Sequence, residues 1–262
     1  MEANYKNWVP KKIMVRLTTS TVAFTAGTAA IMCVRSIDPK VRMIAAGILG
    51  LGAVGSLAST IWSISAHNYF SYSGKKQLSR HIVEGVANYI TLPEGGKGLD
   101  IGCGSGALTI ACAKRNPQGY MVGIDCWARE YTSFSQQLCE SNSAAEGADN
   151  TEFHRGDACK LDFPDEYFDA VTSNYVYHNI AGVNKQKLLR ETFRVLKKGG
   201  TFAIHDIMSR MRYGDMQKFV SELYDEGFQS VELIDTTNGK FMTKCEAGLL
   251  TLSGSKLLVG RK

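Results

Sequence analysis

A glycine-rich loop constrains the fold of this chain more than any other feature. The sequence Asp-Ile-Gly-Cys-Gly-Ser-Gly at 100–106 follows a short apolar stretch, 97–101, and precedes a helix-forming stretch, 107–115. This pattern predicts a strand, a tight turn and a helix, with bare backbone N–H groups and the positive end of the helix facing a ligand. The chain is therefore expected to alternate strands and helices around a ligand-binding loop.

The charges near the loop indicate which ligand it holds. The loop also matches the looser dinucleotide pattern G-x-G-x-x-A, but Asp100 would repel a pyrophosphate and attract an ammonium or sulfonium cation. Asp125 ends the next apolar run, near the offset of about 20 residues at which a carboxylate accepts ribose hydroxyls. Asp157 follows a third run. Each alone could be an ordinary strand end or turn residue, but their register with the loop predicts an acidic pocket for S-adenosylmethionine.

These motifs resemble those of the class I S-adenosylmethionine-dependent methyltransferases. Residues 98–106 are similar to the first motif of that family, 156–158 to its adenine-contacting segment, 168–174 to its fourth strand, and 194–204 to the approach to its fifth. The resemblance runs in order from about residue 75 to the C-terminus and implies S-adenosylmethionine as the cofactor. The expected cofactor-binding residues are Asp100, Gly102, Cys103, Gly104, Gly106, Asp125, Cys126, Asp157, Ala158 and Ser173.

The region after residue 70 is predicted to be an α/β domain with a doubly wound, mostly parallel sheet, because strand and helix patterns alternate. The resemblance implies a Rossmann-like fold of seven strands, with an antiparallel seventh strand between the fifth and sixth. A helix is expected over Leu188–Leu196, with Gly199–Gly200 as its stop. The predicted strands are 97–101, 120–125, 151–154, 168–174, 201–206, 229–235 and 255–261.

The N-terminal region, 1–70, is predicted to anchor the domain, 71–262, to a membrane. Residues 17–34 and 43–66 carry no formal charge, and a charged turn with a proline joins these spans. Their lengths suit a transmembrane helical hairpin. Small residues at four-residue spacing would let the two helices approach closely, namely Ala23 with Gly27, Gly52 with Ser56, and Gly55 with Ser59. A soluble hairpin that covers a groove or forms a homo-oligomer is the alternative. A cleaved signal peptide fits less well, because no clear cleavage site precedes the second span.

Basic residues indicate the orientation and exclude some partners. They cluster before and after the two spans, so the positive-inside rule places both ends, and the catalytic domain, in the cytoplasm. The net charge of +5 is too small and dispersed to indicate nucleic-acid binding. Seven cysteines without a C-x-x-C pair, and without histidines at ligand spacing, argue against a metal site or disulfides.

Three residues are candidates for the chemistry of methyl transfer. In-line displacement at a sulfonium requires alignment and, for a protonated acceptor, a base. His178 follows the fourth strand, where the acceptor is expected, although it could be a structural histidine. His205 is the second candidate, because the neighbouring Asp206 could raise its basicity. Tyr72 could help to cover the acceptor, or it could anchor the chain at a membrane interface.

The acceptor class is less well defined. Ser173–Val176 lacks the prolines found where the family methylates adenine or glutamine amino groups, and 177–180 is similar to the segment found in methyltransferases of quinone-type lipids. Together with the hairpin, this favours a lipophilic or amphiphilic small molecule. A tethered methyltransferase of a soluble metabolite or protein, and a cofactor-binding subunit without activity, remain as alternatives.

Overall fold

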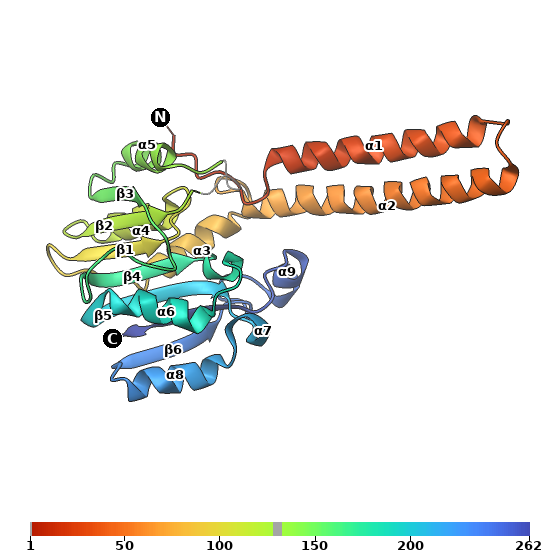
Figure 1. Ribbon diagram of the computed structural model, residues 1–262. Coiled ribbons are helices and arrows are strands. Elements are labelled where there is room, and N and C mark those ends of the chain that lie inside the picture. The colour runs from red at the N-terminus through yellow and green to blue at the C-terminus, as the bar shows by residue number, and fades with distance from the viewer. Residues whose placement is uncertain (1, 128–132) are drawn as a thin grey trace. The chain divides into compact units, whose positions relative to one another are not determined.

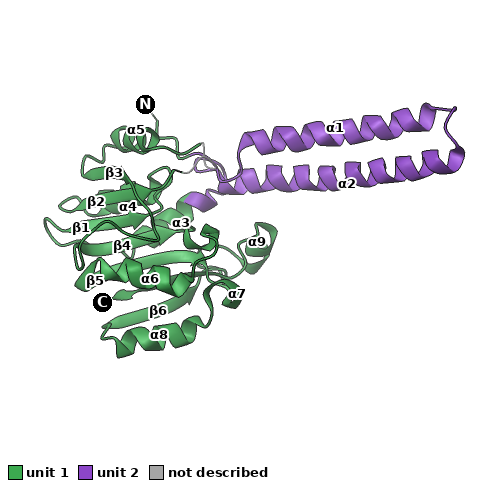
Figure 2. Ribbon diagram, in the orientation of Figure 1, with its two compact units in different colours: residues 1–5, 80–262 green, residues 6–79 purple. Residues whose placement is uncertain are grey.

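The chain forms two compact units. A computed structural model describes residues 2–127 and 133–262 (Figure 1). Lys6–Ser79 make up one unit, here called the hairpin unit. Met1–Tyr5 and Arg80–Lys262 make up the other, the sheet unit (Figure 2).

The predicted boundary after residue 70 differs from this division at both ends. The first residues of the chain belong to the sheet unit, where the backbone of Asn4 is hydrogen-bonded to the side chain of Asn142. At the other end α3, Leu78–Ala87, runs across the boundary. Its residue Gly85 has the Phe241 ring against it, so close that a Cβ there would lie 2.3 Å from a ring carbon.

The hairpin unit consists of two long helices joined by a short turn (Figure 2). Helix α1 is Lys11–Cys33 and helix α2 is Pro39–Phe70, so both extend beyond the predicted spans at their N-terminal ends. Asp38 begins α2, because its carboxylate accepts hydrogen bonds from two backbone N–H groups of the first turn and a proline follows it. The charged turn therefore has a structural role.

Small residues bring α1 and α2 together at two of the expected places. The ring of Phe24 lies on Gly52, where a Cβ would be 2.9 Å from the ring carbons. Leu49 packs against Gly27, at 3.6 Å from the position of its Cβ. Gly55, also expected at the contact, has nothing within 4 Å of that position. The contact between the helices therefore relies on particular glycines.

One helix of the described residues, α2, is long and apolar enough to cross a membrane. Its large apolar side chains point outward, with Ile48 66% and Leu51 75% exposed, whereas Thr60 and Ser63 are buried. Helix α1 falls short of this standard because of its many threonines. The prediction of two apolar spans is thus supported for one helix only.

The sheet unit contains a seven-stranded sheet, as expected (Figure 1). The order is β3-β2-β1-β4-β5-β7-β6, and only β7 is antiparallel to its neighbours among the described strands. This confirms the predicted topology and the place of the last strand. The strands are β1 Lys97–Ile101, β2 Tyr120–Asp125, β3 Thr151–Arg155, β4 Phe168–Asn174, β5 Leu196–Ile207, β6 Ser230–Asp235 and β7 Ser255–Arg261.

Helices connect the strands and cover both faces of the sheet. Strand order runs outward in opposite directions from β1 and β4, so right-handed crossovers put α4 and α6 on opposite faces. The core between these layers includes Phe168, Leu189 and Phe219, none of which is exposed. The described helices are α4 Ala107–Arg115, α5 Gln136–Glu146, the 3₁₀ helix η2 Tyr177–Asn179, α6 Lys185–Arg194, α7 Arg210–Tyr213, α8 Met216–Asp225 and α9 Lys244–Leu249.

The predicted helix stop at Gly199–Gly200 is wrong. Helix α6 ends at Arg194, and both glycines lie inside β5, where the register against β4 shifts. Gly199 has φ +76°, and a Cβ at Gly200 would be 2.9 Å from the carbonyl oxygen of Asp169. The glycines are needed for this irregularity in the strand rather than for a helix end.

Candidate functional site

The glycine loop adopts the conformation that its sequence predicts. Gly102, Gly104 and Gly106 all have left-handed φ angles, of +73°, +57° and +80°. The N–H groups of Gly102 and Cys103 donate to the carbonyl of Ile124, at 2.8 and 3.0 Å, which ties the loop to the end of β2. Helix α4 begins directly after the loop without a side-chain cap, so its positive end is available to a negatively charged group.

The loop lies at the point where strand order reverses between β1 and β4. Val176, two residues past β4, packs so closely on Gly102 that a Cβ there would lie 2.3 Å from a Val176 methyl carbon. In open α/β sheets, ligands bind at this switch point, outside the carboxyl ends of the strands. The loop and the segment after β4 therefore form two sides of one candidate site.

Asp125 lies beside the loop, as predicted for a ribose-binding carboxylate. One of its oxygens accepts the N–H of Gly104 at 2.9 Å, and the other accepts the N–H of Trp127 at 2.7 Å. The indole N–H of Trp127 in turn donates to the carbonyl of Gly104 at 3.0 Å. Each carboxylate oxygen keeps acceptor capacity for a further donor. The role of Trp127 was not predicted, because nothing in a lone tryptophan after a strand indicates it.

Asp100, at the start of the glycine loop, is buried. Its side chain is only 1% exposed and accepts a hydrogen bond from the hydroxyl of Thr109, at 2.6 Å. Burial raises the pKa of Asp100 to about 7, although the bond from Thr109 opposes this rise. The nearby charge of Asp125 adds to it. The carboxyl group is thus positioned to change its protonation state when a cation binds above it.

The remaining predicted cofactor residues have unequal surroundings. Asp157 is exposed and accepts a hydrogen bond from the N–H of Cys159, in the turn after β3. Ala158 beside it is half-buried, and Cys126 is exposed at the end of β2. These three residues follow the carboxyl ends of β2 and β3, the two outermost strands on one side of the sheet. Their contacts with a cofactor remain predictions.

Two of the predicted residues face inward. Ser173 is buried and donates its hydroxyl to the carbonyl of Ile101, at 2.7 Å, which joins β4 to β1. The thiol of Cys103 is buried beside that of Cys139, and burial raises its pKa well above the usual value. Neither side chain is displayed to a ligand here. A contact of Cys103 or Ser173 with the cofactor stays a prediction.

A histidine and a carboxylate meet after β4 and β5. The Nδ1 atom of His178 lies 2.5 Å from Asp206, and the backbone N–H of His178 donates to the other oxygen at 3.0 Å. The histidine side chain is 14% exposed, whereas that of Asp206 is 1% exposed. Because the carboxylate occupies Nδ1, it leaves Nε2 as the nitrogen that can accept a proton from an acceptor.

Tyr213 and Arg212 of α7 hold this histidine–carboxylate pair in place. The hydroxyl of Tyr213 donates to Asp206 at 2.7 Å, and Arg212 donates to the carbonyl of His178 at 3.1 Å. Burial opposes ionisation of Asp206, but the hydrogen bonds from His178, Tyr213 and the N–H of Ile207 outweigh it and hold its pKa below the usual value.

The expected pairing of His205 with Asp206 is wrong. Consecutive residues of a strand point to opposite faces, so Asp206 faces His178 while His205 faces the other side. Both ring nitrogens of His205 have partners, Asn174 at 2.8 Å and Thr236 at 3.0 Å. The ring is completely buried, and burial lowers its pKa to about 3. This environment suits a structural histidine, so we retain His178 as the candidate base.

Tyr72 and Asn142 lie outside the histidine–carboxylate pair. Tyr72 lies in the hairpin unit, just past α2. Asn142 of α5 was missed by the sequence reasoning: it is 2% exposed and donates to the carbonyl of Ser105 in the glycine loop, at 2.9 Å, as well as to Asn4. In the described part of the chain, no group of three His, Cys, Asp or Glu side chains could hold a metal ion.

Residues 92–248 match the family model of the methyltransferase domain, so the chain belongs to that family. The sheet unit is therefore a methyltransferase domain of the class that depends on S-adenosylmethionine. The match covers the glycine loop, the Asp125 carboxylate and the His178–Asp206 pair. It stops short of β7 and leaves the hairpin unit outside.

The chain is similar to curated methyltransferases and, in fold, to solved structures. A demethylmenaquinone methyltransferase of Roseiflexus castenholzii is 31% identical over 44% of this chain and 44% of its own length. A 2-phytyl-1,4-naphthoquinone methyltransferase of Thermosynechococcus vestitus is 32% identical over 46% and 50%. The matches thus span about half of these relatives. The crystal structure of the [4+2]-cyclase SpnF, at 18% identity, covers 73% of this chain and 85% of that one with a TM-score of 0.54, which shows the fold alone.

The residues present fit S-adenosylmethionine. Gly104 has no atom within 4 Å of the position of a Cβ, so the loop is open where a ligand would approach. Asp125 can accept ribose hydroxyls, the uncapped start of α4 suits a carboxylate, and Asp100 adds negative charge beneath a cation. The bound cofactor would supply a methyl group activated by its positive sulfur. The protein supplies the binding groups and the position.

Proposed function

We propose that this chain is a membrane-anchored enzyme that transfers a methyl group from S-adenosylmethionine to a lipophilic, quinone-type acceptor. The observation that carries the chemistry is the His178–Asp206 pair at the carboxyl edge of β4 and β5. Acceptors in α/β enzymes of this kind bind at that edge. The His178 imidazole is 14% exposed and has a buried carboxylate on Nδ1. This is the arrangement of a general base.

The reaction requires alignment of the acceptor with the methyl group and net loss of one proton, while the sulfur departs as a neutral thioether. At a ring carbon, the ring proton is the one finally lost and the hydroxyl group is restored. The reduced form of a quinone carries acidic hydroxyl groups, and removal of one such proton makes the oxygen and the ring carbons nucleophilic. Nε2 of His178 would take that proton, and Asp206 would stabilise the resulting imidazolium. Tyr213 and Arg212 would keep the ring in its orientation through their bonds to the pair. A low-polarity environment would strengthen each of these interactions.

Two observations support a quinone-type acceptor. Curated relatives that share about a third of aligned residues are named for methylation of demethylmenaquinone and phytyl-naphthoquinone. Such molecules are lipids, and α2 presents apolar side chains on its outer surface over a length that can span a bilayer. An enzyme held at the membrane would meet a membrane-dissolved acceptor at high local concentration.

Helix α1 also suits a lipid environment despite its modest hydropathy. Hydroxyls of Thr18, Thr21, Thr25 and Thr28 each donate to the carbonyl four residues earlier, at 2.8–2.9 Å. Polar groups that are satisfied within their own helix lose most of their cost in lipid. The basic residues on both flanks would then place the two ends of the hairpin, and the methyltransferase domain, on the cytoplasmic side.

Labelled methyl transfer to a lipid extract tests this proposal. Full-length protein in vesicles would be incubated with methyl-labelled S-adenosylmethionine and either a native lipid extract or a water-soluble extract, and the products identified by mass spectrometry. We expect label in a quinone-type lipid and its loss in His178→Ala. Label only in soluble products would contradict the lipophilic acceptor. Cofactor binding without any turnover would favour a non-catalytic subunit.

A further inference from the structure

We infer that the surface around α7 docks onto an anionic lipid bilayer beside the candidate catalytic pair. This inference rests on the proposed function and concerns the sheet unit alone. It names which part of the methyltransferase domain meets the membrane from which the acceptor comes. Four observations carry it: a pocket, its charge, one exposed apolar side chain, and hydrogen bonds to His178 and Asp206.

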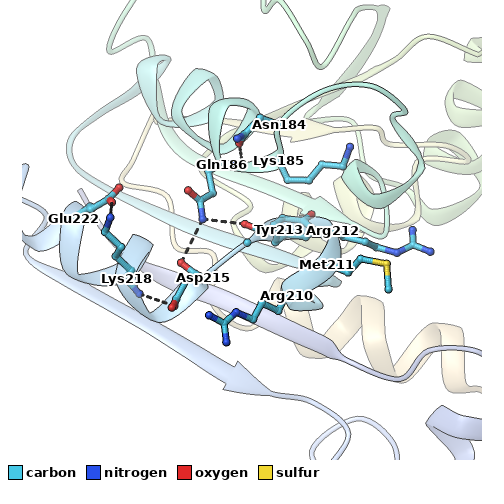
Figure 3. Close-up of a pocket in the computed structure, with 11 residues that line it drawn as sticks. Asn184, Lys185, Gln186, Arg210, Met211, Arg212, Tyr213, Asp215, Lys218 and Glu222 are labelled. Atoms are coloured by element: carbon cyan, nitrogen blue, oxygen red, sulfur yellow. Dashed lines mark hydrogen bonds and ion pairs between the residues drawn. The ribbon is translucent and has the colours of Figure 1, made fainter.

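A pocket of about 390 Å³ lies between α7 and the starts of α6 and α8. Figure 3 shows the side chains of Arg210, Met211 and Lys218 around it. Helices α6 and α8 both begin here, with Asn184 and Asp215 as their N-caps. The volume is ample for a phosphate headgroup.

The charge around the pocket is positive in surplus. Of the acidic groups that line it, Asp215 accepts two backbone N–H groups at the start of α8, which hold its pKa below the usual value. Glu222 is paired with Arg190 at 2.8 Å. Arg210 and Arg212 are exposed on α7, and Lys218 is 3.8 Å from Glu222. These cations complement the negative headgroups of an anionic leaflet.

Met211 distinguishes a bilayer from a free anion as the occupant. Its side chain is 96% exposed, and it lies between Arg210 and Arg212 in sequence. A thioether adds nothing to the binding of a soluble phosphate, but an apolar side chain between two cations suits the boundary between headgroups and acyl chains. Flexible methionine side chains also adapt well to irregular apolar surroundings.

The inner side of α7 is bonded to the candidate catalytic pair. Arg212 donates to the carbonyl of His178 and Tyr213 donates to Asp206. Met211 therefore lies on α7, the helix whose Arg212 and Tyr213 position His178 and Asp206. Contact of Met211 with lipid would place the acceptor side of the domain at the membrane surface.

Tryptophan quenching by lipids with brominated acyl chains tests the inference on the full-length protein. Met211→Trp is reconstituted in vesicles that contain phosphatidylglycerol, and its emission is compared with that of the wild type. We expect an additional quenched component. Gln229→Trp is the matched control, because Gln229 is exposed before β6, at the opposite end of the strands from α7, and should add an unquenched component.

The native Trp62 in α2 separates this inference from membrane anchoring itself. Loss of a quenched component in Trp62→Phe shows that the hairpin is in lipid. If the emission of Trp62 is quenched but the emission added by Met211→Trp is not, the inferred docking surface is wrong and the membrane anchor stands. If the reverse holds, α7 contacts lipid without the anchor. If neither is quenched, both proposals are wrong.

Charge variants give a second readout. Removing Arg210 and Lys218 in turn, as Arg210→Gln and Lys218→Gln in the Met211→Trp background, should each lower the ratio of docked to undocked α7 about fivefold on anionic vesicles. Phosphatidylcholine vesicles should show the undocked level throughout. Inorganic phosphate should act no more strongly than another salt at equal ionic strength. Selective competition by phosphate, or no difference between the two lipids, would overturn a lipid-docking surface.

Discussion

The two units of this chain distribute apolar side chains in opposite ways. In the sheet unit, Ile101 and Leu189 are completely buried, and Asp100, Lys185 and Asp206 are the charged side chains that are buried among the described residues. In the hairpin unit, Ile48 and Leu51 are 66% and 75% exposed, while Thr60 and Ser63 of α2 are buried. The first arrangement is that of a protein folded in water, and the second is the one expected in lipid. The difference teaches that an apolar side chain is not buried by its composition alone, and the exposed apolar surface of α2 is the feature that supports the proposed membrane anchor.

The largest expected effect separates the two units by function. His178→Ala should lower turnover roughly 10²-fold or more, because the acceptor would lose its base, while membrane association stays the same. Steady-state assays and carbonate extraction measure the two properties. His154→Ala is the control, since His154 is an exposed histidine of β3. Turnover within a few-fold of the wild type would remove His178 from the mechanism.

A carboxylate introduced near the middle of α2 should have the next largest effect. Leu51→Asp should weaken membrane insertion by about 2.5–3.5 kcal/mol, because it puts a carboxylate near the middle of α2. Leu249→Asp, at a 45% exposed position of the sheet unit, should change stability by at most about 0.5 kcal/mol. Carbonate extraction and thermal unfolding measure the pair. Equal tolerance of both substitutions would show that α2 faces water.

Asp125→Ala tests the cofactor site within the sheet unit. Binding of S-adenosylmethionine should weaken by about 1–3 kcal/mol, because ribose hydroxyls would lose a charged acceptor and the glycine loop would lose its bond at Gly104. Titration calorimetry measures the change, with exposed Asp149→Ala as the control. An unchanged dissociation constant in a folded variant would place the cofactor elsewhere.

Asp100 should make cofactor affinity depend on pH. Its folded pKa of about 7 lies above the ordinary 3.8, so between these values the folded state keeps a proton that the unfolded state releases, and stability falls as pH rises. A cation bound nearby favours the ionised form. Binding should therefore release a proton, and affinity should rise with pH up to about 7, by at most about tenfold per pH unit. Calorimetry in buffers of different ionisation enthalpy detects the proton, and Asp100→Asn should abolish the effect.

The smallest expected effect lies within the sheet unit, where the first residues of the chain contact α5. The N–H of Asn4 donates to Asn142 at 2.7 Å, and Asn142 holds the glycine loop at Ser105. Asn4→Pro removes this donor and should weaken cofactor binding by about 0.5–1.5 kcal/mol. Asn4→Ala keeps the backbone bond and should bind like the wild type. Identical affinities of the two variants would show that the first residues do not influence the loop.

Local sequence patterns are enough to predict most of the strands, helices and turns of the sheet unit. The alternation of strand and helix signals gave the sheet, and the glycine spacing gave the loop with its left-handed residues, because glycine alone adopts such angles freely. The position of Asp125 beside the glycine loop could be predicted, because the end of a parallel strand places a side chain at the ligand edge. The strand bounds differed by few residues except in β5, where Gly199 and Gly200 suit an irregular strand as well as a helix end.

The sequence by itself determined the class of fold, the cofactor loop and the apolar character of α2, since each follows from residues close together in the chain. Only the tertiary structure decided that Asp206 serves His178 and not its neighbour His205, that Tyr213 supports the pair, and that Asn142 joins the first residues to the glycine loop. The pairing of Asp206 with His178 spans 28 residues and depends on which face of β5 each side chain takes. Contacts between distant residues depend on packing in three dimensions, which no local pattern records.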